Sequence, residues 1–261
     1  MQAFKGLIIK EQKLMMNTFL SGIGLLILAV IGGFGLTRYF NEPNILAAVI
    51  FGVVFAHVFY LPLYVLMSLN IEAKTQTWLH NPNSGSLLFL AKLLSGLMSF
   101  CASMLISIGI LSIVINQSQV MDFFQMFGGS LVFNLILMLA GITCLAVHLS
   151  IWVLFYWGLF HSLKNVPVIG KIRWLFLIAF WIVQMMVGNY FTQLGIYQSI
   201  IEFGTIEVQS KWFQFNTDQS SFAVGLSDTA QLSITSGIIY LGLSALVFFL
   251  ASWLLEKKVE V

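Results

Sequence analysis

Residues 44–69 read NILAAVIFGVVFAHVFYLPLYVLMSL and contain no charged side chain. A helix needs about 20 predominantly apolar residues to cross the hydrocarbon core of a bilayer. Across the 261 residues, 59% are hydrophobic and only 8% are charged, against roughly 25% charged in an ordinary soluble domain. Continuous apolar runs of this kind differ from the short alternating strands of a membrane barrel. The stretch therefore predicts an all-α integral membrane protein.

Further runs of the same kind predict six transmembrane helices in one domain over 1–261, at residues 16–37, 44–69, 87–115, 128–157, 173–193 and 233–255. Every Lys and Arg except Arg38 and Lys211 lies on one side of these spans. Basic residues near span ends mark the cytoplasmic side. We therefore expect a multi-pass protein of a bacterial cell membrane with both termini in the cytoplasm.

Two segments outside the spans have a pattern of their own. Residues 1–15 are expected to form an amphipathic interfacial helix, because the apolar residues there keep a helical period; a simple positive flank is the alternative. That helix would gather Phe4, Leu7, Ile8 and Leu14 on one face and leave Lys5, Glu11 and Lys13 elsewhere. Residues 194–232 form the longest external connection, and a small cap is expected there. It would hold a short helix near 197–203, and TIEV and KWFQF are expected to be short strands or amphipathic pieces.

Motifs for chemistry are missing from the chain. It contains no G-x-x-x-x-G-K-[ST] sequence for a nucleotide and no HExxH sequence for a metal, so we expect no enzyme, no bound cofactor and no metal. Cys101 and Cys144 lie in apolar runs without a CxxC motif and are expected to be buried thiols. No acidic residue lies at mid-membrane, which disfavours an ion-coupled carrier. A nucleic-acid partner is not expected either.

Two stripes of polar residues follow helical spacing within the spans. The second span carries His57, Tyr60, Tyr64 and Ser68 on one face, and the fifth carries Trp181, Gln184, Gly188 and Thr192. One reading makes these faces a substrate path between two protomers. The other makes them packing contacts, because polar groups inside a membrane need partners whatever their role.

The connection at residues 70–86 is unusually elaborate. Asn81-Pro82-Asn83-Ser84 is strong turn chemistry, and Pro82 disfavours helix at Asn81. Residues 72–79 can form a short helix before the turn, and Ser84 or Ser86 can cap the helix after it. A rigid projection of this kind at the inner surface suits docking to a cytosolic partner.

This connection resembles that of permease subunits of ABC transporters of the type-2 exporter class. In that family an acidic residue, a Thr, a Leu, a Pro-x-Ser turn and an apolar run with Ala-Lys follow one another. The corresponding residues are Glu72, Thr75 or Thr77, Leu79, Pro82-Asn83-Ser84, Leu87-Leu88 and Ala91-Lys92. The family often has a basic residue after the turn; here Gly85 and Ser86 follow, so Lys74 and Lys92 are expected to supply that charge.

The resemblance implies a permease that couples ATP hydrolysis by separate cytosolic ABC ATPase subunits to export of an amphipathic substrate such as a peptide, a lipid or a drug-like molecule. ATP and Mg would bind the ATPase, and a second permease copy or a related permease would complete the pore within the membrane lipids. The expected contacts with the ATPase are Glu72, Lys74, Thr75, Trp78, Leu79, His80, Asn81, Pro82 and Ser84. The alternative is a membrane scaffold or sensor that binds a cytosolic partner and an external ligand without transport.

Overall fold

The computed structural model describes residues 2–42, 44–75, 83–115, 131–164, 166–167, 169–218 and 221–257. Its helices are α1 (Gln2–Phe40), α2 (Asn44–Thr75), α3 (Gly85–Ile115), α5 (Leu131–Ser162), α6 (Arg173–Gln193), α7 (Gly195–Glu202) and α8 (Ile234–Lys257), with a 3-10 turn η1 at Ile169–Lys171. The strands are β1 (Thr205–Asp218) and β2 (Ser221–Ser233). Within these described ranges, six helices are long and apolar enough to cross a membrane, namely all but α7. The predicted all-α fold with six spans is confirmed.

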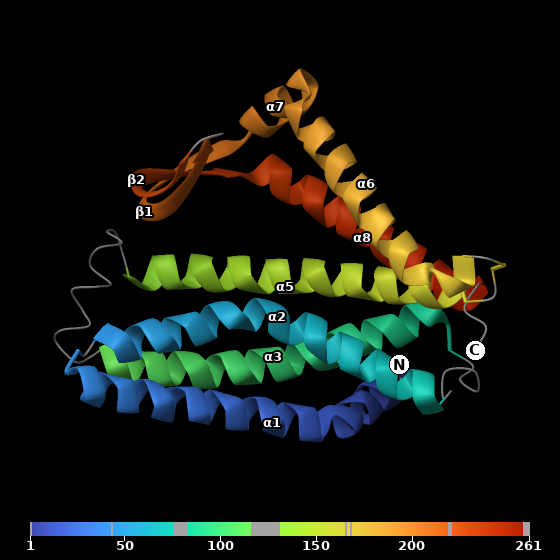
Figure 1. The fold of residues 1–261 in the computed structure, drawn as a ribbon, viewed down its shortest axis with the longest axis horizontal. Coiled ribbons are helices and arrows are strands. Elements are labelled where there is room, and N and C mark those ends of the chain that lie inside the picture. The colour runs from blue at the N-terminus through green and yellow to red at the C-terminus, as the bar shows by residue number, and fades with distance from the viewer. Residues whose placement is uncertain are drawn as a thin grey trace.

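The helices form two unequal parts (Figure 1). α1, α2, α3 and α5 run alongside one another, whereas α6 and α8 diverge from α5 at an angle. At one end of the bundle α1, α3 and α6 begin and α2, α5 and α8 end, so both termini lie there. We call it the basic end, because it carries Lys5, Lys10, Lys13, Lys74, Lys164, Lys171, Arg173 and Lys257.

The core of the bundle is built around α2. This helix packs against α1, α3 and α5, and Val54, Leu61 and Val65 on it are fully buried. By contrast, Leu177 is the one buried residue among the described side chains of α6. An exposed apolar helix is inexpensive in a bilayer, since lipid chains cover such side chains as well as protein does.

The amino-terminal segment differs from the expectation of a separate interfacial helix. Residues 2–15 belong to the same continuous helix as the first span, which ends at Phe40 with Asn41 at a φ of 55°. Asn tolerates this left-handed conformation at a helix end better than most residues. The buried face of the segment carries Leu7, Glu11 and Met15. Placing Glu11 away from that face was therefore wrong.

The predicted external segment lies at the other end of the bundle and begins with α7. Gly204, at a φ of 90°, then turns the chain into the antiparallel hairpin of β1 and β2. The register runs from Thr205 opposite Ser233 to Asp218 opposite Ser221, with an irregularity between Gln209 and Trp212. The short strands expected at TIEV and KWFQF thus both belong to β1.

Candidate functional site

A cluster of buried charged side chains lies where α1, α2 and α3 meet near the basic end. Glu11 of α1 and Glu72 of α2 are each 3% exposed, and Lys92 of α3 is 1% exposed. Charged side chains are almost never this buried unless they are paired. We call Lys10, Glu11, Ser68, Glu72 and Lys92 the charge cluster.

Lys92 lies at the centre of the charge cluster. Its ammonium group donates to both carboxylate oxygens of Glu11, at 2.9 and 3.0 Å, and to Ser68 Oγ at 2.8 Å. It also lies 2.7 Å from Glu72 Oε2. The Ser68 hydroxyl in turn donates to Glu11 Oε2 at 2.6 Å. One ammonium group therefore joins three helices.

Lys10 completes the cluster from its more exposed edge. Its Nζ lies 2.5 Å from Glu72 Oε1 and 3.9 Å from Glu11 Oε1. Two ammonium groups thus face two carboxylates, and the formal charge of the cluster is zero. A balanced and hydrogen-bonded arrangement is the form in which buried charges are tolerated.

Helical spacing explains how the sequence assembles the cluster. Ser68 and Glu72 are four residues apart on α2, so they lie on one face. Glu11 takes the position between Leu7 and Met15 on the buried face of α1. Sequence reasoning did not pair Glu11 with Lys92. The available signal was Lys92 itself, since a cation inside an apolar run demands an anionic partner.

The structure changes the role expected for the polar residues of the 70–86 connection. The carboxylate of Glu72 is buried against Lys10 and Lys92 in the single chain and is not exposed at the surface. Lys74 and Ser84 are exposed, and Ser84 Oγ shares a hydrogen bond with Ser86 Oγ at 3.1 Å. The remaining expected contacts lie outside the described side chains: Thr75, Trp78, Leu79, His80, Asn81 and Pro82.

Gly85, which stands where the family often has a basic residue, begins α3 against the end of α8. Its backbone N–H donates to Glu256 Oε1 at 2.6 Å. A Cβ atom at Gly85 would lie 3.0 Å from Glu256 Cγ and 3.2 Å from the carbonyl oxygen of Ser252. Any side chain at this position would therefore require Glu256 or the end of α8 to shift by a few tenths of an ångström. A carboxylate at a helix amino terminus also complements the helix dipole.

The polar stripe of α2 packs against α3 in the single chain. His57 Nδ1 donates to the carbonyl oxygen of Val53 at 2.8 Å, so its Nε2 accepts from Ser103 Oγ at 3.0 Å. Tyr64 Oη shares a hydrogen bond of 2.8 Å with Ser95 Oγ. Ser68 belongs to the charge cluster. These contacts agree with the packing interpretation, because each of the three side chains is buried and forms a hydrogen bond with a side chain of a neighbouring helix.

Tyr60 is the remaining member of that stripe. Its ring stacks on His57 with centroids 5.9 Å apart. Among the side chains that the structure describes, its hydroxyl is buried without a hydrogen-bond partner.

The stripe of α6 has a different setting. Trp181, Gly188 and Thr192 are exposed, and a Cβ atom at Gly188 would meet nothing within 4 Å. Gln184 alone is engaged by another helix, since its Oε1 accepts a hydrogen bond from Tyr156 of α5. This face remains open in the single chain.

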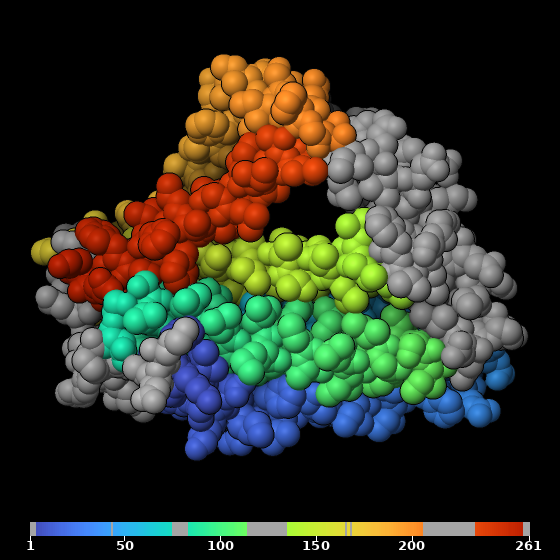
Figure 2. All heavy atoms as spheres, turned by 180° about the vertical axis from the view of Figure 1, so that it is seen from behind, coloured from blue at the N-terminus to red at the C-terminus, as the bar shows by residue number. Residues whose placement is uncertain are grey.

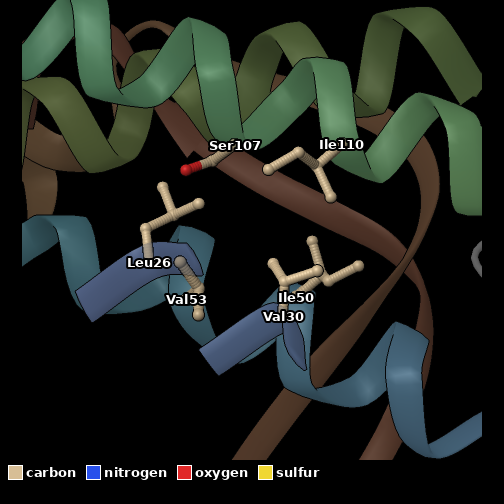
Figure 3. Close-up of a pocket in the computed structure, with 6 residues that line it drawn as sticks. All are labelled: Leu26, Val30, Ile50, Val53, Ser107 and Ile110. Atoms are coloured by element: carbon tan, nitrogen blue, oxygen red, sulfur yellow. The ribbon is translucent and has the colours of Figure 1, made fainter. Parts of the chain in front are cut away.

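A small hollow between α1, α2 and α3 is a packing seam and no binding site (Figure 3). The residues that line it come from all three helices, with Leu26 and Val30 of α1 opposite Ser107 and Ile110 of α3. Its volume for a water-sized molecule is about 0 Å³. The Ser107 hydroxyl is already bonded to the carbonyl oxygen of Ser103 at 3.1 Å.

Cys101 and Cys144 were expected to be buried thiols, but both are exposed on the bundle. Among the described residues, no group of three or more His, Cys, Asp or Glu side chains could hold a metal ion.

The fold and the charge cluster define a multi-pass helical membrane protein of six candidate spans, with a neutral ion cluster joining the first three. The chain is a distant homologue of the uncharacterized protein YhcE of Bacillus subtilis (strain 168). The two are 25% identical over 264 residues, which cover 100% of both chains. No family profile and no solved structure match the chain.

Proposed function

We propose that this chain is the permease subunit of an ABC exporter of the type-2 class. A separate cytosolic ATPase would hydrolyse ATP, and the 70–86 connection would carry its motion into the membrane. The proposal rests on the residues around that connection, on the arrangement of the six helices, and on the charge cluster.

The charge cluster is the observation that carries the proposal. Glu72 lies near the start of the connection and Lys92 shortly after its end, and each forms an ion pair with a side chain of α1. Separating a buried ion pair is costly, since removing one partner of such a pair costs about 3–5 kcal/mol. A force applied to residues 76–84 would therefore move α1, α2 and α3 as a unit.

The same geometry supports different roles for residues of the connection. Glu72 would transmit motion without touching the ATPase, whereas the exposed Lys74 and Ser84 would touch it. The positive-inside rule supports a cytoplasmic position for the basic end, where this connection lies. A second permease copy would complete the transporter, and the exposed stripe of α6 is the remaining candidate lining for a substrate path.

The test is purification of the tagged chain from membranes of its native host. We expect a P-loop ATPase to accompany it in fixed stoichiometry, with ATP hydrolysis that amphipathic compounds stimulate after reconstitution. Replacing both Lys74 and Ser84 with Glu should abolish this association. Arg38→Glu is the matched control, since Arg38 is exposed at the opposite end of the bundle.

Two results would count against the proposal. The first is the absence of any P-loop ATPase from the wild-type preparation. The second is a stable complex whose rate of ATP hydrolysis ignores every amphipathic compound; this favours the scaffold or sensor, whose partner binds without transport.

A further inference from the structure

A cavity of about 540 Å³ lies between α3, α5 and α8, with one side chain of α2 at its wall. This volume falls within the range of ordinary small-molecule sites, about 300–1,000 Å³. The lining is mainly aliphatic and aromatic, as at Leu94, Leu97, Leu241 and Phe248, and none of the side chains that line it is charged.

The polar side chains in the wall offer nothing to a polar ligand. Ser244 Oγ donates to the carbonyl oxygen of Tyr240 at 2.7 Å, so His148 Nδ1 donates to Ser244 Oγ at 2.8 Å. His148 Nε2 then accepts from Trp152 Nε1 at 3.0 Å. Both ring nitrogens of His148 are thereby occupied.

Thr143 behaves in the same way, since its hydroxyl donates to the carbonyl oxygen of Leu139 at 2.8 Å. With these hydrogen bonds already made inside the protein, the cavity is chemically apolar. Water therefore finds few free hydrogen-bonding groups on these walls. An empty cavity also forfeits the dispersion contacts of its lining.

The position of the cavity selects what can fill it. Cys144 and His148 lie near the middle of the span Leu135–Ser162. Leu90 and Leu97 lie about 8 and 18 Å along α3 from its start at Gly85, at 1.5 Å per residue. The cavity therefore begins about 8 Å inside the basic end and reaches the middle of a hydrocarbon core of roughly 30 Å. On α8 its lining continues slightly past the middle of the helix, to Leu241.

The cavity is open to the side of the bundle. Leu241 and Phe249 in its wall are 68% and 67% exposed. Figure 2 shows α8 lying against α3 and α5 near the basic end and separating from α5 farther along, with an opening between them. Lipid chains of the adjacent leaflet thus have direct access to the cavity.

We propose that this cavity binds one acyl chain of a bilayer phospholipid from the leaflet on the basic side. The chain enters between α5 and α8, and its methylene groups restore the contacts that the empty cavity lacks. The site is independent of the proposed transport function, because it requires neither an ATPase nor a second permease.

Two exposed thiols supply a matched pair of variants. Cys144 lines the cavity, whereas Cys101 lies on α3 outside its lining. Cys144→Trp puts an indole in the space assigned to the acyl chain, and Cys101→Trp adds the same bulk elsewhere.

The first measurement is native mass spectrometry of the chain released from nanodiscs of phosphatidylethanolamine and phosphatidylglycerol. The wild type and Cys101→Trp should each retain one more phospholipid than Cys144→Trp. Equal retention by all three would overturn the proposal. A retained species without the mass of a phospholipid would overturn it as well.

The second measurement uses the wild type alone, so it does not depend on how a variant folds. A phospholipid with a diazirine in the middle of its acyl chain is incorporated into vesicles of the same two lipids and photoactivated. We expect labelling to concentrate on residues 143–151 and 241–249, above that of the exposed face of α6. Labelling of α6 at an equal or higher level would show transient contact with lipid and would refute the site.

Discussion

Lys92→Met tests the charge cluster most directly. Met keeps much of the length of Lys92 but removes the ammonium group that contacts Glu11, Ser68 and Glu72. Lys10 alone then faces two carboxylates, and it lies 3.9 Å from the nearer oxygen of Glu11. The carboxylate of Glu11 is left as a buried charge without a close cation.

The size of the effect follows from that geometry. Breaking a buried ion pair by removing one partner costs about 3–5 kcal/mol. At roughly 2–4 °C per kcal/mol for chains of 150–250 residues, the apparent unfolding midpoint should fall on the order of 10 °C. Thermal unfolding of the purified chain in one fixed detergent, followed by tryptophan fluorescence, measures that midpoint.

Two further variants make the result specific. Lys74→Met removes an exposed cation near the same end, and its effect should stay within about 0.5 kcal/mol. The double variant Glu11→Gln with Lys92→Met leaves Lys10 and Glu72 as a balanced pair, so it should recover much of the loss. If Lys92→Met unfolds within a degree of Lys74→Met, or if the double variant is less stable than Lys92→Met, the cluster does not hold the three helices together.

Three smaller predictions use the same unfolding assay. Gly96→Ala should lower the stability by about 1–3 kcal/mol through overpacking, because its Cβ would lie 2.6 Å from Leu61 Cδ1. The control Gly109→Ala meets nothing within 4 Å and should stabilise α3 by up to about 1 kcal/mol. Equal effects of the two substitutions on stability would contradict the packing described here. Glu256→Gln should cost about 0.3–1 kcal/mol by removing a charge from the amino terminus of α3, and a loss that persists undiminished in high salt would argue against that cause. His57→Phe should cost about 1–3 kcal/mol, since Ser103 loses a buried acceptor for its hydroxyl; an unchanged midpoint would show that this hydrogen bond is dispensable.

The spans were predictable because the bilayer imposes a simple rule on the sequence. A run of about 20 apolar residues satisfies it without reference to any other part of the chain, so α2, α3, α6 and α8 begin within two residues of the predicted starts. The short helix of the external segment and parts of β1 also followed from local pattern, whereas β2 (Ser221–Ser233) was not predicted.

The candidate site was only partly predictable. Glu72 and Lys92 stood out because each is a charge at the edge of an apolar run, yet Glu11, the second carboxylate that Lys92 contacts, lies far away in the sequence. Periodicity placed Glu11 with the polar residues of the amino-terminal segment, because a charge was assumed to avoid a buried face. The ammonium group of Lys92 reverses that preference.

The polar stripes were also only partly predictable from the sequence. Helical spacing correctly placed His57, Tyr64 and Ser68 on one face of α2, but it could not tell a path from a packing surface. That distinction depends on which helix lies opposite, and α3 supplies Ser95 and Ser103 there.

Composition and the distribution of Lys and Arg were enough to make this a six-span helical membrane protein with an expected orientation, because the lipid bilayer acts on each segment separately. The meeting of Glu11, Glu72 and Lys92, the fit of Gly85 against Glu256 and the cavity between α3, α5 and α8 came only from the tertiary structure. Each of them joins residues that are far apart in the chain, and the energies of such contacts depend on distances of a few ångströms that no local pattern encodes.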